Sequence, residues 1–156
     1  MKVKLYSEGL RFIAKSGVGK AVSHQEQALT MNHIPCQVNG NGFDYDLIHI
    51  NTVGPLSVIK ATIARFRGKK VVMHAHSTEE DFRDSFFFSN TVSPLFKSWL
   101  KFVYCQGDIV ITPTPYSKRL LESYQMGVHI ESLSNGIDLS KFSSDHERGQ
   151  TFRKVY

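Results

Sequence analysis

The segment HAHSTEEDFRDS, residues 74–85, concentrates ionisable side chains directly after a strand-like apolar run. His74 and His76 are two residues apart, so they lie on one face of an extended chain. Two imidazoles there could ligate a metal, but zinc needs further protein ligands at a recognisable spacing, and the acids that follow form none. We therefore expect no metal. His74, deeper in the strand, is expected to be structural, and His76, at the carboxyl end, is the candidate that meets a ligand.

The acids of this segment have a second interpretation. Ser77 or Thr78 can be the N-cap of a helix. The acids at positions 79–81 would then occupy its first turn, where the helix dipole favours negative charge. This interpretation explains the acids without catalysis, but it does not explain the two histidines.

The segment KSGVGKAV, residues 15–22, places two glycines before a helix-like pattern. Gly17 and Gly19 would allow the backbone to approach a phosphate, whose charge the helix dipole favours. The dinucleotide fingerprint would need a third glycine where the chain has Val22, and a P-loop would fail at positions 14 and 21, which are alanine. A tight turn before a helix and a phosphate-facing loop of another kind both stay open.

Aromatic residues are concentrated between positions 86 and 104, and Lys97 and Lys101 follow each other at one helical turn. A core helix is one interpretation. The other is a helix that rests on a membrane, with aromatics toward the acyl chains and lysines toward anionic headgroups. Three consecutive phenylalanines cannot all face one core, which favours the second. The membrane-contact candidates are Phe86, Phe87, Phe88, Lys97, Trp99 and Lys101.

Strand-like and helix-like segments alternate along the chain and would position these candidates. Strands are expected at 3–6, 35–38, 47–50, 70–75, 108–112 and 130–133, and helices at 16–32 (with Ser16 as N-cap), 55–68, 91–106 and 116–125. Repeated β-then-α units predict an α/β fold with a Rossmann-like, doubly wound parallel sheet. Ligands bind such sheets at the carboxyl ends of the strands. That rule selects four polar loops, 7–19, 51–54, 76–85 and 112–118.

The composition is that of one globular domain. The chain has 156 residues, 41% hydrophobic and 21% charged, with a formal net charge of +5 that favours anionic partners. Cys36 and Cys105 are far apart and are expected to be reduced thiols in a cytosolic protein. We find no signal-peptide pattern and no apolar run approaching the ~20 residues that span a bilayer. Beyond residue 138 the pattern fails, so we expect a domain over 1–138 and a linker or tail over 139–156.

Four segments together resemble the N-terminal half of a retaining family 4 glycosyltransferase of the GT-B fold. They are KSGVGKAVSHQEQAL, VVMHAHSTEEDFRDSF, ITPTPYSKRLL and LSNGIDLSKF. Within that family the chain is similar to streptococcal-type glycolipid synthases, which add a second sugar, often galactose, to glucosyl-diacylglycerol. The resemblance covers nearly all of residues 1–142, and SNGID is typical of the junction between the two Rossmann-like domains.

The resemblance implies roles for particular residues. Gly17, Val18 and Gly19 would face the donor diphosphate, and His76 would contact the transferred sugar near the reaction centre. The remaining acceptor or headgroup candidates are Lys118, Arg119, Glu79 and Glu80. The donor would be a nucleotide diphosphate sugar, UDP-galactose or UDP-glucose, with no metal and no cofactor. Because the family's C-terminal domain supplies most nucleotide contacts, this chain alone is expected to be inactive.

The resemblance thus implies the acceptor-binding half of an enzyme that moves a hexose to a membrane glycolipid such as glucosyl-diacylglycerol. Such an enzyme would be cytoplasmic and peripherally associated with the inner face of the cell membrane. One alternative is a family 4 enzyme with a soluble or polysaccharide acceptor. Another is a non-catalytic Rossmann-like module that binds phosphate or nucleic acid. Nucleic acid is disfavoured because the basic residues near 60–70 are not interleaved with stacking aromatics.

Overall fold

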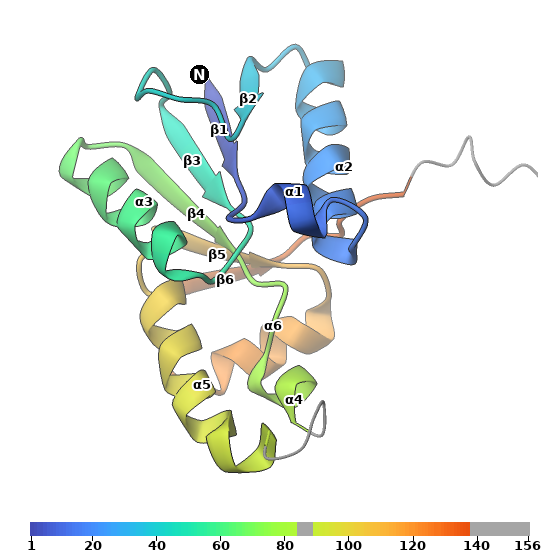
Figure 1. Cartoon of the computed structure of the whole chain (residues 1–156), viewed down its shortest axis with the longest axis vertical. Coiled ribbons are helices and arrows are strands. Elements are labelled where there is room, and N and C mark those ends of the chain that lie inside the picture. Colours follow the sequence, from blue (N-terminus) through green and yellow to red (C-terminus); the bar gives the residue numbers. More distant parts are fainter. Residues whose placement is uncertain (84–88, 138–156) are drawn as a thin grey trace, which may run out of the picture.

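A computed structural model of the chain describes residues 1–83 and 89–137 and contains one six-stranded sheet (Figure 1). Every neighbouring pair of strands is parallel, and the strand order is β2-β1-β3-β4-β5-β6. The strands are β1 (Val3–Tyr6), β2 (Cys36–Val38), β3 (Leu47–Ile50), β4 (Lys70–His74), β5 (Ile109–Thr112) and β6 (His129–Ser132). The order confirms the predicted Rossmann-like, doubly wound sheet.

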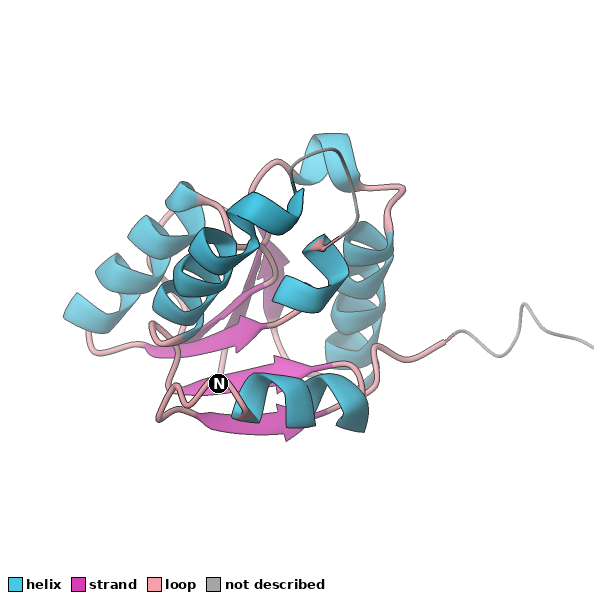
Figure 2. Cartoon of the chain, turned by 90° about the horizontal axis from the view of Figure 1, so that it is seen from below, coloured by secondary structure: helices cyan, strands magenta, loops and turns pink. Residues whose placement is uncertain are grey.

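Helices connect all consecutive strands except β2 and β3, and they pack on both faces of the sheet (Figure 2). The long ones are α2 (Gly17–Met31), α3 (Pro55–Phe66), α5 (Ser89–Tyr104) and α6 (Pro115–Glu122), and the short ones are α1 (Leu10–Ile13) and α4 (Glu79–Phe82). The chain winds from β1 to β2 in one direction and from β3 to β6 in the other. Right-handed crossovers therefore place α2 on one face and the helices after β3 on the opposite face. The sequence pattern did not predict α1.

Two helix starts follow the expected local chemistry, and a proline lies inside a third helix. The Ser16 side chain accepts a hydrogen bond from the Gly19 amide at 3.3 Å, which confirms Ser16 as the N-cap of α2. Thr78 caps α4 in a capping box with Asp81, so of the two candidates Thr78 is the N-cap. Pro94 lies inside α5, beyond the first turn, and has no N–H to donate to the Asn90 carbonyl; Ser93 Oγ lies 3.4 Å from that carbonyl oxygen.

Alternation along the strands divides the buried side chains between two clusters. The larger cluster includes Ile48, Ile50, Val71, Met73 and Val110 and faces the helices that follow β3. The smaller cluster is formed by Val3, Leu5 and Val22 between β1 and α2. Because successive side chains of a strand point to opposite faces, His49 and His74 lie on the α2 side of the sheet.

The last described residues, 133–137, leave β6 and pass against α2, where His24 Nδ1 lies 3.1 Å from the Gly136 carbonyl oxygen. The boundary expected near residue 138 and the tail over 139–156 lie outside the described residues. So do the candidates Phe86, Phe87 and Phe88. The division into domains therefore stays a prediction.

Candidate functional site

The four predicted loops meet at the carboxyl edge of the sheet. The amide of Glu8, after β1, donates to Thr52 Oγ1, after β3, at 2.7 Å. His76, after β4, contacts the side chain of Asn51. The Thr112 hydroxyl at the end of β5 donates to the Ala75 carbonyl at 3.3 Å. Loops far apart in the sequence thus form one continuous polar rim.

Three histidine rings from β3, β4 and the following loop are stacked beneath this rim. The rings of His74 and His76 are parallel within 2°, with centroids 4.1 Å apart, and those of His49 and His74 are 5.2 Å apart. His49 Nε2 lies 3.0 Å from His74 Nδ1. His74 is 3% exposed and lies in the middle of the stack, as its expected structural role requires.

Two side-chain amides lie beside the stack. Gln25, on α2, and Asn51 exchange two hydrogen bonds: Gln25 Nε2 donates to Asn51 Oδ1 at 2.8 Å, and Asn51 Nδ2 donates to Gln25 Oε1 at 3.0 Å. Gln25 Nε2 also lies 3.1 Å from His74 Nδ1. Asn51 Oδ1 lies 3.1 Å from His76 Nε2. The predicted site residue His76 is therefore held by residues from two other elements.

Burial keeps the stacked rings uncharged at neutral pH. Desolvation lowers the pKa of His76 to about 4, and desolvation together with the nearby His76 ring lowers the pKa of His49 to about 4. The pKa of His74 is lowered to about 2, first by desolvation and then by repulsion from the other two rings, against a small opposing effect of Asn135. His76 can therefore accept or donate a hydrogen bond, but it is not a cation at pH 7.

The glycine segment forms the first turn of α2. Gly19 is buried, and a Cβ at this position would overlap the carbonyl groups of Ile13 and Ala14, so close packing on α1 requires a glycine. Gly17 is exposed, and a Cβ there would meet nothing within 4 Å. The Gly19 amide is used by the Ser16 cap, whereas the first amides of a helix have no intrahelical acceptor. The amides of Gly17 and Val18 are thus the ones that can bind a phosphate.

The N-terminus of α3 already binds a carboxylate of this chain. A Glu8 carboxylate oxygen accepts from the Ser57 amide at 3.1 Å, and a Cβ on Gly54 would overlap this carboxylate. A carboxylate at a helix N-terminus is favoured by the helix dipole. An external anion would have to displace Glu8 here, so the start of α2 is the better phosphate site of the two.

Glu79 and Glu80 connect α4 to its neighbours. Glu79 is 2% exposed and binds Arg83 Nη2 at 2.8 Å and Lys97 Nζ at 3.0 Å, while Ser93 donates to it at 3.0 Å. Burial acts to raise the pKa of Glu79, but these hydrogen bonds outweigh it and hold the pKa below its usual value. Glu80 accepts from the Tyr124 hydroxyl at 2.6 Å. Both carboxylates have partners inside the domain, which leaves them little capacity for an acceptor.

The two basic candidates on α6 lie in different surroundings. Lys118 Nζ binds Glu131 Oε2 at 3.2 Å and so joins α6 to β6. Arg119 is exposed. Neither residue lines the cavity of about 200 Å³ beside His76, which is formed by Ala75, His76, Thr78, Asp81, Pro113, Thr114, Tyr116 and Ser117. The structure therefore does not bring Lys118 and Arg119 together with His76.

The α5 surface is only partly free. Trp99 is half-buried, and its Nε1 donates to the Val53 carbonyl at 2.8 Å. Lys97 binds Glu79, and its ammonium group also lies 4.3 Å from the centre of the Tyr124 ring. Lys101 forms no ion pair with any residue of 1–83 or 89–137. The large apolar side chains that protrude from this helix are Val92, Leu95 and Phe102.

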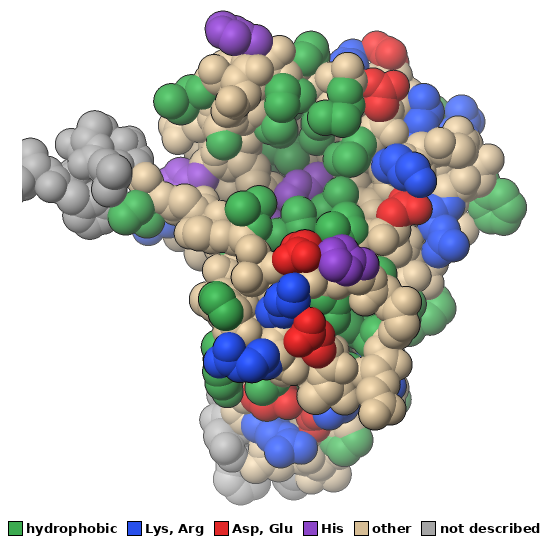
Figure 3. Space-filling model, turned by 180° about the vertical axis from the view of Figure 1, so that it is seen from behind, with side chains coloured by type: hydrophobic (Ala, Val, Ile, Leu, Met, Phe, Trp, Pro, Cys, Tyr) green, Lys and Arg blue, Asp and Glu red, His purple; other side chains and the backbone are tan. Residues whose placement is uncertain are grey.

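A second cavity, of about 590 Å³, lies between α2 and the segment 133–137. Its floor includes His49 and His74, and its walls include Ala28, Met31 and Ile137. Figure 3 shows histidine and hydrophobic side chains in a hollow on this side of the molecule.

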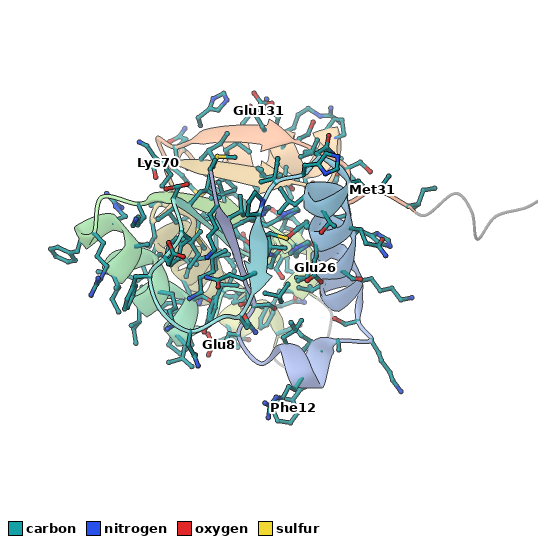
Figure 4. All side chains as sticks on the ribbon, turned by 90° about the horizontal axis from the view of Figure 1, so that it is seen from above. Glu8, Phe12, Glu26, Met31, Lys70 and Glu131 are labelled. Carbon is teal, nitrogen blue, oxygen red and sulfur yellow. The ribbon has the colours of Figure 1, made fainter. Side chains whose placement is uncertain are left out.

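Phe12 on α1 is 93% exposed and extends away from the sheet (Figure 4). Within the described ranges, no group of three or more His, Cys, Asp or Glu side chains could hold a metal ion.

Residue patterns did not identify Gln25, His49 or Asn51. A signal for Gln25 was present, because it continues the apolar stripe of Val18, Val22 and Leu29 on α2 as a polar residue. Asn51 directly follows a strand at the ligand-binding edge, which is also a recognisable position. His49 had no signal of its own, since it fits an alternating strand equally well.

Comparisons with known proteins agree on the kind of protein. The sequence profile of Glycosyltransferase Family 4 matches residues 39–141. A processive diacylglycerol alpha-glucosyltransferase from Acholeplasma laidlawii is 40% identical over 158 aligned residues, which include all of this chain and 46% of the relative. The chain thus spans about half the length of this relative.

A solved structure has the same fold. The crystal structure of Anabaena HepE in complex with UDP and glucose superposes with a TM-score of 0.50, over 97% of this chain and 50% of that protein, at 16% identity. At that identity the likeness concerns the fold alone. Among the described helices, none is long and apolar enough to cross a membrane.

Proposed function

The chain belongs to Glycosyltransferase Family 4, and on that premise we propose that it is the acceptor-side half of an enzyme that transfers a hexose to a glycolipid. The observation that carries the proposal is the 40% identity, along the whole chain, to a diacylglycerol glucosyltransferase. The position of His76 supports it, because this uncharged side chain lies at the carboxyl edge where parallel sheets bind ligands. The other half of the enzyme would supply most contacts to the donor nucleotide.

In this proposal the chain contributes two functions to the transfer. The start of α2 stabilises the departing diphosphate, since the amides of Gly17 and Val18 and the helix dipole favour negative charge there. His76 contacts the transferred sugar through a hydrogen bond. The donor is UDP-glucose or UDP-galactose, and neither role requires a metal or another cofactor.

The acceptor is a diacylglycerol glycolipid in the inner face of the cell membrane, and the enzyme binds that membrane peripherally. The exposed Leu95 and Phe102 on α5 support this part of the proposal, as does the charge of Lys101, which has no ion-pair partner within residues 1–83 and 89–137. Apolar side chains beside a basic residue suit an interface that presents acyl chains below anionic headgroups. The net charge of +5 acts in the same direction.

A second candidate is a family 4 enzyme with a soluble or polysaccharide acceptor. Two contacts favour it: the Trp99 indole is hydrogen-bonded to Val53 and the Lys97 ammonium to Glu79, so neither is free for a membrane. Family membership disfavours the third alternative, a non-catalytic module.

The test is a transfer assay with the whole protein that contains this chain. UDP-glucose and UDP-galactose are each offered with diacylglycerol, glucosyl-diacylglycerol and a soluble oligosaccharide, and the products are identified by mass spectrometry. We expect transfer to one of the lipids and its loss in a His76→Ala variant. Transfer to the oligosaccharide alone would support the second candidate, and no transfer with any pair would contradict both.

A further inference from the structure

We propose that Asn51 and Gln25 are positioning residues that hold His76 as a neutral ring with its proton on Nε2, so that Nδ1 remains to accept a hydroxyl of the sugar. This inference rests on the proposed function for its role in transfer. The state of the ring can be measured without any transfer, so the two proposals can fail separately.

The orientation of the Asn51 amide is fixed by its pairing with Gln25. Asn51 is 2% exposed, and its two polar atoms pair with the two polar atoms of Gln25, at 2.8 and 3.0 Å. Such a reciprocal pair prevents either amide from rotating alone, because a single rotation would place two oxygens or two NH₂ groups together. The Gln25 side chain comes from α2, so the pair also connects the helix to the edge of the sheet.

The hydrogen-bond partners of the three histidine rings assign their protons. Asn51 Oδ1 is an acceptor, so His76 Nε2, 3.1 Å away, carries a proton. Gln25 Nε2 is a donor, so His74 Nδ1, 3.1 Å away, is an acceptor and His74 carries its proton on Nε2. His49 Nε2 lies 3.0 Å from the same His74 nitrogen, so it also carries a proton, and the two donors share the single lone pair of His74 Nδ1. All three rings are in the same tautomer, assigned from the hydrogen-bond network.

Asn135 is consistent with this assignment. His74 Nε2 and Asn135 Oδ1 are both buried and have no hydrogen-bond partner among the described residues. Asn135 stabilises the protonated form of His74, as expected for a carboxamide oxygen near the N–H of the ring. A proton on His74 Nε2 agrees with this effect, because the opposite tautomer would offer Asn135 Oδ1 a second acceptor instead of a donor.

The two nitrogens of the His76 ring have different surroundings. Its Nε2 is bound to Asn51, and Asn51 does not line the cavity of about 200 Å³ beside His76. The remaining nitrogen, Nδ1, is an acceptor without charge. It suits a sugar hydroxyl, which can donate a proton, and it does not suit a phosphate, which offers only acceptors at this position. An uncharged acceptor at this position agrees with the proposed contact between His76 and the sugar.

The direct test is ¹⁵N-histidine NMR of this chain at pH 7, which distinguishes the two neutral tautomers. The His76 signal is assigned by its loss in His76→Gln. We expect His76 with its proton on Nε2, a mixture of both tautomers in Asn51→Leu, and a return to the Nε2 proton in Asn51→Asp, which keeps the acceptor oxygen. A His76 tautomer that is unchanged in Asn51→Leu would overturn the proposal.

Matched variants on α2 test the second positioning residue. Gln25→Met removes the amide at nearly constant volume, and Gln27→Met makes the same change at an exposed position two residues away. We expect a mixture of His76 tautomers in the first variant and the parent spectrum in the second. Equal spectra of both variants would exclude Gln25 from the role.

Steady-state kinetics of the whole enzyme test whether the positioning matters for transfer. Asn51→Leu should lower kcat about 10-fold to 100-fold with a much smaller change in the KM of the nucleotide sugar, and Asn51→Asp should recover part of the loss. A purely structural role would give no rescue by aspartate and would lower the yield of folded protein instead. If NMR shows the expected tautomers while the whole enzyme transfers no sugar, the proposed function fails and the positioning role stands.

Discussion

The rings of His74 and His76 are stacked 4.1 Å apart, yet their surroundings differ. His74 lies between two other rings and is 3% exposed, whereas His76 lines a cavity at the edge of the sheet. Polar groups that meet a ligand contribute to turnover, and polar groups fully enclosed by the protein contribute to stability. The two histidines should therefore respond in opposite ways to replacement.

We predict that His76→Ala in the whole enzyme lowers turnover by about 10²-fold or more with little loss of stability. His74→Ala should lower the free energy of unfolding, since it removes a buried ring and leaves its partners unpaired. Steady-state kinetics and urea unfolding of both variants check this prediction. A His76→Ala enzyme that is fully active but unstable would show that His76 is structural.

Acid should destabilise the chain through the same rings. The folded pKa values of His49 and His76 are about 4 and that of His74 about 2, all below the value of about 6.5 in the unfolded chain. Between pH 6.5 and 4 the unfolded chain therefore binds more protons than the folded one, so stability is complete above pH 6.5 and falls as the pH decreases. For three rings the loss approaches about 4 kcal/mol per pH unit near pH 5.

Urea unfolding at several pH values between 7.5 and 4.5 measures this slope. In His76→Gln one titrating ring is absent, so the slope should be smaller by about a third. A free energy of unfolding that does not change between pH 7.5 and 5 would contradict the proposed state of the rings.

At the scale of the elements, Glu79 joins α4 to α5 through a buried carboxylate. We predict that Glu79→Ala lowers the free energy of unfolding by roughly 1–3 kcal/mol, because Ser93 and Lys97 lose a partner at a buried position. Lys101→Met is the control. Lys101 lies on α5, one turn after Lys97, and its replacement should change the free energy of unfolding by less than about 0.5 kcal/mol. Chemical denaturation compares them, and equal effects would show that the ion pairs contribute nothing specific.

The α5 surface should bind anionic vesicles in two separable ways. Basic residues contribute about 1 kcal/mol each near an anionic surface, and salt weakens this contribution. Exposed apolar side chains add about 25 cal/mol per Å² buried, which salt does not weaken. Co-sedimentation at several salt concentrations should therefore show a smaller salt dependence in Lys101→Gln and a lower salt-resistant binding in Phe102→Ser.

Two comparisons make the vesicle experiment specific. Lys97→Gln should reduce the salt dependence less than Lys101→Gln, because Lys97 is already paired with Glu79. Polar substitutions within Phe86–Phe88 test whether that run adds to the salt-resistant part, as the sequence pattern predicts. Absence of binding to anionic vesicles even at low salt would favour the soluble acceptor.

At the scale of the whole molecule, the proposed function assigns this chain, which spans 46% of its relative, to the acceptor side of a two-domain cleft. We predict that this chain alone transfers no sugar and binds UDP-glucose with a dissociation constant of about 1 mM or weaker, since one helix start and one hydrogen bond supply few contacts. Isothermal titration calorimetry of the chain, with the whole protein as control, tests this. Micromolar binding by the chain alone would place the donor site inside it.

Limited proteolysis tests the expected domain boundary. The tail over 139–156 should be cleaved first, while a core of 1–138 resists, because β6, the last strand of the described ranges, ends at Ser132. A tail that resists as long as the central strands would contradict the boundary.

Local chemistry in the sequence determined the strands and the long helices and their order along the chain, although it did not predict α1. The Ser16 cap, the Thr78 start and the alternation of apolar residues depend on neighbours within a few positions, so they could be predicted. The parallel sheet followed from the alternation of strands and helices, and the family followed from four motifs in the right order. His76 could be named as a candidate because its strand ends where such sheets bind ligands.

The tertiary structure decided which side chains meet across elements. Gln25 reaches Asn51 and His74 only because α2 packs on the face of the sheet that carries the histidines. Glu79 and Lys97 looked available in the sequence, but 18 positions of chain fold back to pair them at 3.0 Å. Which residues form such pairs depends on helix orientation and strand order rather than on local sequence. The reason is that the partners are distant along the chain, and the pair contributes to stability only when folding buries them next to each other.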